Sequence, residues 1–123
     1  MSKILVGVPY LEGSDINPDS SLKPNVCQGK PVIMMVQGNF CGYCTQAKPA
    51  FQQLAQSTPS VVAVTIQTDG GASDKKASEM IANVNKSPGV PAFLGFNSQG
   101  KFIGAHSGGR DLASLQAFAS SLQ

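Results

Sequence analysis

The stretch that decides the fold is Asn39-Phe40-Cys41-Gly42-Tyr43-Cys44-Thr45-Gln46-Ala47-Lys48-Pro49, which follows an apolar run and opens a segment with a helical pattern. It contains two of the three cysteines of the chain. In the first turn of a helix Cys41 and Cys44 share a face, so their sulfurs can form a reversible disulfide. Unpaired backbone N–H groups and the helix dipole also favour a thiolate there, the form that attacks disulfides. The stretch therefore predicts thiol–disulfide chemistry.

The composition limits the classes of protein to be considered. A chain of 123 residues suits one domain with one core, and only 13% of its residues are charged. A net charge of +2, with no basic run alternating with aromatic residues, argues against nucleic acid as a partner. No apolar run approaches the roughly 20 residues that cross a bilayer, so we expect a soluble protein with no membrane partner. Three cysteines, two of them in a C-x-x-C, favour a redox pair and a reducing, cytoplasmic location.

The first 30 residues are expected to form a strand and a long connection ahead of the core. We interpret segment 3–8 as a strand rather than a secretory leader, because Pro9, Glu12 and Asp15 end its apolar part. From there to Lys30 the chain is rich in turn-forming residues and lacks apolar periodicity. This pattern predicts a surface connection with room for a helical turn.

Residues 31–123 predict the core of a single domain in which strands and helices alternate. The run 31–37 is continuously apolar, as in a strand buried on both faces of a mostly parallel sheet, and it leads directly to the cysteine pair. The pair should thus lie at the C-terminal end of a central strand, where open α/β sheets place their sites. The other expected elements are a helix over 43–57, a strand over 61–67, a helix over 75–84 capped by Asp74, a strand after Pro91, a hairpin turn over 97–100, a strand over 101–105, and a terminal helix capped by Asp111.

These residues together resemble the thioredoxin-like superfamily from Lys30 to Leu122. The features that carry the resemblance are Phe40-Cys41-Gly42-Tyr43-Cys44, Pro49 five residues past the second cysteine, Gly89-Val90-Pro91 ahead of a strand, and Gly108 after the hairpin. The resemblance implies an α/β, thioredoxin-like fold. Its mixed central sheet would have four to five strands, flanked by helices on both faces.

The resemblance also implies a substrate face around the cysteines. Pro91 would be cis and pack against the pair, the backbone of Val90 would pair with an extended substrate, and Gly108 would leave room for a protein or peptide. Phe40 is expected to form a hydrophobic rim for partners. Tyr43 either contacts the thiolate or covers the helix end. The residues expected to contact substrate are Phe40, Gly42, Tyr43, Val90, Pro91 and Gly108.

The sequence departs from thioredoxins at two positions beneath the pair. Met35 stands where thioredoxins have a buried aspartate, six residues before the first cysteine, and Thr65 lies near the position of their lysine. No carboxylate of the central strand can then act as an internal base. The dipeptide Gly42-Tyr43 is similar to that of bacterial disulfide isomerases, so we expect a reduction potential above that of thioredoxin.

The expected function is that of an enzyme, a thiol–disulfide oxidoreductase without a cofactor. Cys41 would attack a protein or peptide disulfide and Cys44 would resolve the mixed disulfide. A reductase or a small thiol would supply the electrons. An alternative is a non-catalytic module that binds a partner through Phe40, Val90 and Gly108.

A zinc site is a further alternative, because three cysteines and a histidine are suitable ligands. Cys27, Cys41, Cys44 and His106 would supply three thiolates and one imidazole. Their spacing is not that of a compact zinc module. Considered separately, Cys27 predicts a free or half-buried thiol and His106 a solvated residue at the end of the hairpin.

Overall fold

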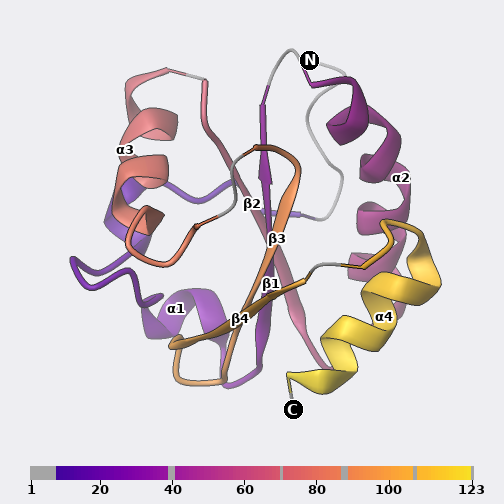
Figure 1. The fold of residues 1–123 in the computed structure, drawn as a ribbon. Helices are drawn as coiled ribbons and strands as arrows, with labels where there is room; N and C mark the ends of the chain where they lie inside the picture. The colour runs from indigo at the N-terminus through magenta and orange to yellow at the C-terminus, as the bar shows by residue number, and fades with distance from the viewer. Residues whose placement is uncertain (1–7, 39–40, 70, 87–88, 107, 123) are drawn as a thin grey trace.

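A mixed sheet forms the centre of the computed structural model, which describes residues 8–38, 41–69, 71–86, 89–106 and 108–122. Within these ranges the sheet has four strands in the order β2-β1-β3-β4 (Figure 1). The strands are β1 (Val32–Gln37), β2 (Val62–Gln67), β3 (Ala92–Phe96) and β4 (Phe102–His106). β1 pairs in parallel with β2 and antiparallel with β3, which pairs antiparallel with β4. The predicted central strand is confirmed.

Helices cover both faces of this sheet, as expected. They are η1 (Gly13–Asp15, a 3₁₀ helix), α1 (Pro24–Cys27), α2 (Gly42–Ser57), α3 (Ala72–Ile81) and α4 (Leu112–Ser121). α1 and α3 lie on one side of the sheet, and α2 and α4 on the other (Figure 1). Side chains of a strand alternate between the two faces, so β1 contributes to two separate cores. Met34 packs under α1 and α3, whereas Ile33 and Met35 pack under α2 and α4.

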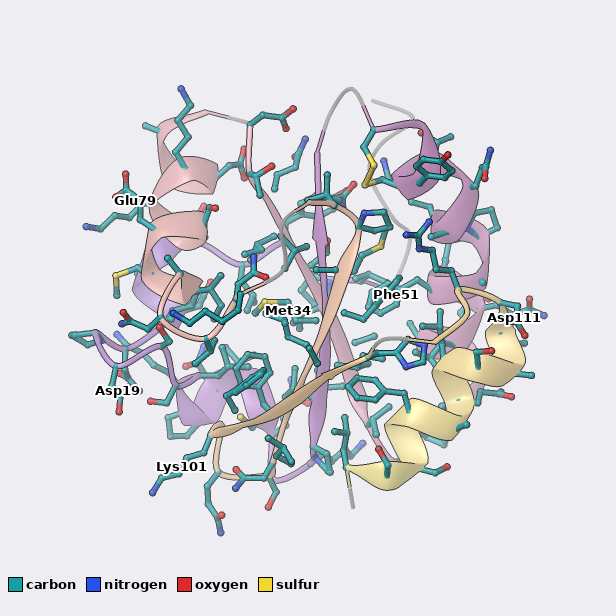
Figure 2. The ribbon with its side chains drawn as sticks, viewed as in Figure 1. Asp19, Met34, Phe51, Glu79, Lys101 and Asp111 are labelled. Carbon is teal, nitrogen blue, oxygen red and sulfur yellow. A yellow bond between two sulfur atoms is a disulfide. The ribbon has the colours of Figure 1, made fainter. Side chains whose placement is uncertain are left out.

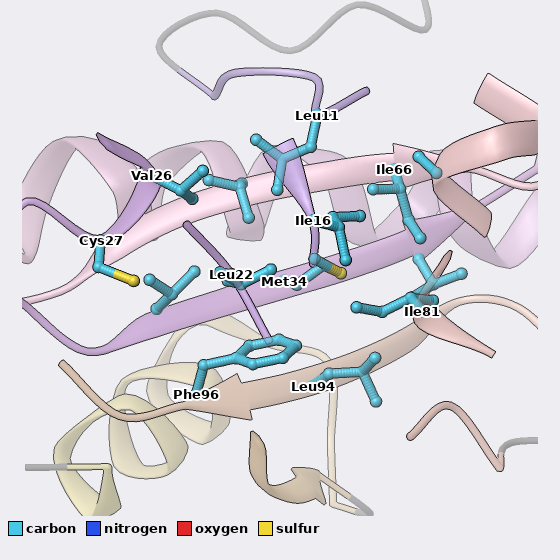
Figure 3. Close-up of a cluster of buried hydrophobic side chains, with 14 of the residues drawn as sticks. Leu11, Ile16, Leu22, Val26, Cys27, Met34, Ile66, Ile81, Leu94 and Phe96 are labelled. Atoms are coloured by element: carbon cyan, nitrogen blue, oxygen red, sulfur yellow. The ribbon is translucent and has the colours of Figure 1, made fainter. Parts of the chain in front are cut away.

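The expectation of a surface connection before Lys30 is wrong. Leu11, Ile16, Leu22 and Val26 are each at most 6% exposed and close over Met34 of β1 (Figure 3). Ile16 and Leu22 pair in an isolated β-bridge and Val26 belongs to α1, so the spacing of these apolar residues follows no single period in the sequence.

The hairpin between β3 and β4 holds this N-terminal segment in place. The Leu22 N–H donates to the Gly100 carbonyl at 2.8 Å. Gly100 has a φ of +83°, and a Cβ there would meet the Leu22 backbone, so only glycine suits this position. The strand expected over 3–8 lies outside the described residues except for Val8, which is buried but belongs to no strand.

An acidic residue lies at or near the start of both α3 and α4. Asp111 caps α4 as predicted, because its side chain accepts from the Ser114 N–H. Asp74 was predicted to cap a helix over 75–84, but α3 already begins at Ala72 with Gly71 as its N-cap. Asp74 instead lies in the first turn and accepts from the Gly71 N–H at 3.0 Å. An acidic residue is favourable at either position, so the sequence alone places this helix start poorly.

Candidate active site

The two cysteines lie at the start of α2, directly after the C-terminal end of β1. Cys41 is the N-cap residue of the helix and Cys44 belongs to its first turn. A disulfide joins them, with their Cα atoms 5.1 Å apart, inside the usual range for such bonds. The backbone N–H of Cys44 donates to Cys41 Sγ at 2.9 Å. The predicted placement of the pair at a helix start is confirmed.

The two sulfurs differ in their access to solvent. Cys44 is fully buried among the side chains under α2, whereas Cys41 is only partly buried. The Cys44 N–H and the positive end of the helix dipole both point at the more accessible sulfur, so a negative charge on Cys41 would be stabilised. Cys41 is thus the sulfur that a large substrate can reach.

The loop before β3 lies against the pair. The bond between Val90 and Pro91 is cis, as the resemblance implied, and Pro91 is buried. The Val90 carbonyl oxygen lies 3.5 Å from Cys41 Sγ. A backbone group of this loop therefore adjoins the more accessible sulfur.

The other residues expected to contact substrate differ in their exposure and in their neighbours. Tyr43 is 64% exposed, and the guanidinium carbon of Arg110 lies 5.3 Å from the centre of its ring. Gly42 is exposed at the first position of α2, with open space where a Cβ would be. A Cβ on Gly108 would come within 2.9 Å of the His106 ring, so this glycine accommodates the imidazole. Phe40 lies outside the described residues.

No carboxylate lies beneath the pair in the described part of the chain. Met35 is fully buried in the same cluster as Cys44, and its register neighbour on β2 is Thr65. The buried polar side chains among the described residues are Ser20, Gln37, Thr65 and Gln67. None of these can carry the proton of Cys44 as an acid or base at neutral pH.

The sequence analysis did not predict the buried side-chain amide of Gln37 at the end of β1. Gln37 Nε2 donates to Thr65 Oγ1 at 2.9 Å and to the Tyr10 hydroxyl at 3.2 Å, and Thr65 Oγ1 donates to the Met35 carbonyl at 2.7 Å. Gln37 Oε1 is buried without a hydrogen-bond partner among the described residues. The signal was a lone polar residue closing a strand that is buried on both faces, because such a side chain must find partners inside.

The four residues of the zinc alternative are not brought together. Cys27 is 1% exposed and packs on the opposite face of the sheet from Cys44. His106 Nε2 lies 2.7 Å from the Gly109 carbonyl oxygen, and its ring packs against Phe118. Across the described ranges, no group of three or more His, Cys, Asp or Glu side chains is placed to hold a metal ion.

Cys27 is a free thiol, as expected, and it is fully buried because α1 packs onto the sheet; this burial raises the pKa of the thiol. His106 is half-buried instead of solvated, because Phe93 and Phe118 flank its ring.

No helix within the described residues has both the length and the apolar character to cross a membrane.

The structure combines three features that define thioredoxin-fold proteins. They are a C-x-x-C disulfide at a helix start, a cis-proline loop against this disulfide, and a mixed sheet between helices. The family model described as Thioredoxin matches residues 16–121. A protein of Invertebrate iridescent virus 6, whose name describes it as thioredoxin-like, is 32% identical over 101 residues, covering 72% of this chain and 70% of the viral protein. The chain belongs to the thioredoxin family.

Solved structures confirm the fold. The short form of spinach chloroplast thioredoxin f superposes with a TM-score of 0.69 at 18% identity, covering 97% of this chain and 96% of that one. Oxidised mitochondrial thioredoxin 3 of Saccharomyces cerevisiae gives a TM-score of 0.67 at 19% identity, with 99% and 100% covered. At these identities the likeness shows the thioredoxin fold alone. The family and the C-x-x-C disulfide together support thiol–disulfide oxidoreduction as the general class of activity.

Proposed function

We propose that this protein exchanges disulfides of protein or peptide substrates through the Cys41–Cys44 pair. The observation that carries the proposal is the asymmetry of the pair. Cys41 is accessible and accepts a backbone N–H from the helix start, whereas Cys44 is fully buried three residues further on. This arrangement suits an attacking thiol and a resolving thiol in that order.

In the reduced protein, the Cys41 thiolate attacks one sulfur of the substrate disulfide. The substrate S–S bond breaks, one substrate thiolate leaves, and a mixed disulfide joins the substrate to Cys41. Cys44 then loses its proton to water or to the departing thiolate and attacks Cys41 Sγ. The second substrate thiolate leaves, so the substrate gains two electrons and the Cys41–Cys44 disulfide is formed.

The substrate chain would lie across the loop before β3. The Val90 carbonyl lies beside Cys41 Sγ, so the backbone of this loop is available to pair with an extended segment held at the sulfur. Pro91, Gly42, Tyr43, Gly108 and Phe40 would complete the contact surface. A reductase or a small thiol in a reducing compartment such as the cytoplasm would return the protein to its dithiol form.

Reduction of insulin by dithiothreitol tests the proposal. The wild-type protein should accelerate the reduction, and Cys41→Ser should abolish the acceleration because no thiolate remains to attack. Cys27→Ser is the matched control, because that thiol is buried on the other face of the sheet. Equal acceleration by the wild-type protein and by Cys41→Ser would refute the proposal.

A further inference from the structure

A groove begins beside Tyr43, in the first turn of α2, and runs between this helix and the start of α4. It has a volume of about 460 Å³. Its lining includes Tyr43, Gln46, Ala50 and Gln53 of α2, and Arg110 and Asp111 directly before α4. Tyr43 lies in the same first turn of α2 as Cys44, so the groove opens beside the helix turn that carries the pair.

The lining of the groove carries one charge of each sign. Arg110 and Asp111 are its two charged lining residues. The Asp111 carboxylate is occupied by the cap of α4, with Oδ1 accepting from the Ser114 hydroxyl at 2.6 Å and Oδ2 facing the Ser114 N–H at 3.4 Å. Arg110 is exposed and has no carboxylate partner among the described residues; its guanidinium lies over the Tyr43 ring.

The position of Arg110 suits the binding of a carboxylate. A guanidinium lying over an aromatic ring is held by the ring's negative face, while the N–H groups at its edge stay free. Those N–H groups form a planar fork that matches a carboxylate with two parallel hydrogen bonds. The side-chain amides of Gln46 and Gln53 line the same groove and can donate further hydrogen bonds.

We propose that this groove binds an acidic side chain of the substrate close to the cysteine that Cys41 attacks. Arg110 is then the residue that selects acidic peptides. The inference rests on the proposed function, because it concerns the substrates of the same cysteine pair.

Peptide disulfides that differ at one position test the inference. Three series carry Glu, Gln or Lys at the same position, placed one to four residues from the reacting cysteine. The measurement is kcat/KM for their reduction by the reduced protein. For at least one position the wild-type protein should prefer Glu over Gln about fivefold, the size expected for one exposed charged pair. The preference should shrink in 0.5 M NaCl, because salt screens exposed charges.

Variants at Arg110 identify the residue responsible. Arg110→Gln should remove the preference for Glu, and Arg110→Glu should reverse it in favour of Lys. Lys101→Gln is the matched control, since it removes one positive charge from the β3–β4 turn, far from the disulfide in Figure 2, and should keep the preference. Equal rates with Glu and Gln peptides at every position, or an unchanged preference in Arg110→Gln, would overturn the inference alone. Failure of the wild-type protein to reduce any peptide would refute the proposed function, and the inference with it.

Discussion

Replacing Met35 by aspartate would place a carboxylate where the structure holds only apolar and neutral groups. Met35 is fully buried in the cluster that contains Cys44. The nearby Thr65 hydroxyl already donates its proton to the Met35 carbonyl at 2.7 Å. The buried polar side chains among the described residues include no Lys or Arg, so the new carboxylate would have no cation beside it. The neutral acid should therefore be strongly favoured in the folded state.

The pH dependence of the stability follows from burying a carboxyl group that has no cationic partner. Such burial raises the pKa of a carboxyl group by about 3 units, from about 3.9 in the unfolded chain to about 7 in the folded one. Between these two values the folded state binds a proton that the unfolded state lacks. The free energy of unfolding should then fall by about 1.4 kcal/mol per pH unit, or about 4 kcal/mol in total. This is a large part of the 5 to 15 kcal/mol typical of a domain.

Urea unfolding of the oxidised protein between pH 4.5 and pH 8 measures this effect. Met35→Asn is the control, because it loses the same methionine contacts and introduces a polar group of similar shape without a charge. The stabilities of the two variants should be close at pH 4.5 and diverge as the pH rises, with Met35→Asp the weaker. A difference that stays constant with pH would show that the carboxylate finds water or a cation there, and would refute the reasoning.

Three further predictions concern stability, each measured by urea unfolding. Burial raises the pKa of Cys27, so the unfolded chain loses this proton first and stability should fall as the pH rises above about 8.5; a fall of the same size in Cys27→Ala would contradict this. Thr65→Val removes a hydrogen-bond acceptor from the buried Gln37 amide and should cost about 1 to 3 kcal/mol, and a neutral result would show that the amide finds another partner. Gly95→Ala would push a Cβ into side chains at the end of α4 and should lower the free energy of unfolding by about 1 to 3 kcal/mol. Gly104→Ala is the control, because its Cβ would meet nothing within 4 Å. Equal losses of stability in the two variants would contradict this packing.

The sequence predicted the elements whose signal is local and continuous. The apolar run of β1 and the cysteine pair at the start of α2 are contiguous, so both position and chemistry could be inferred. The hairpin between β3 and β4 was found from its turn residues, with Asn97 Oδ1 accepting from the N–H groups of Gln99 and Lys101. The cis bond before Pro91 came from family resemblance, because local sequence carries little information about it.

The features that were missed depend on contacts between distant residues. Leu11, Ile16 and Leu22 are buried because the segment before α1 folds back over the sheet, and no periodic pattern marks such a segment. The hydrogen bonds of the Gln37 amide join β1 to β2 and to a residue near the start of the chain. The contact of Arg110 with Tyr43 likewise joins the loop before α4 to α2. Each of these pairs becomes visible only once the fold has brought its members together.

Trapping of the mixed disulfide tests the central claim most directly, because the claim assigns attack to Cys41 and resolution to Cys44. Each reduced protein is mixed with a peptide disulfide, and the intact mass is recorded over time with Cys27→Ser as the common background. Cys44→Ser should accumulate one peptide per protein on Cys41, because no thiol remains to release it. Cys41→Ser should gain peptide far more slowly, since Cys44 is fully buried. Equally fast trapping by both variants, or trapping by Cys41→Ser alone, would contradict the assignment.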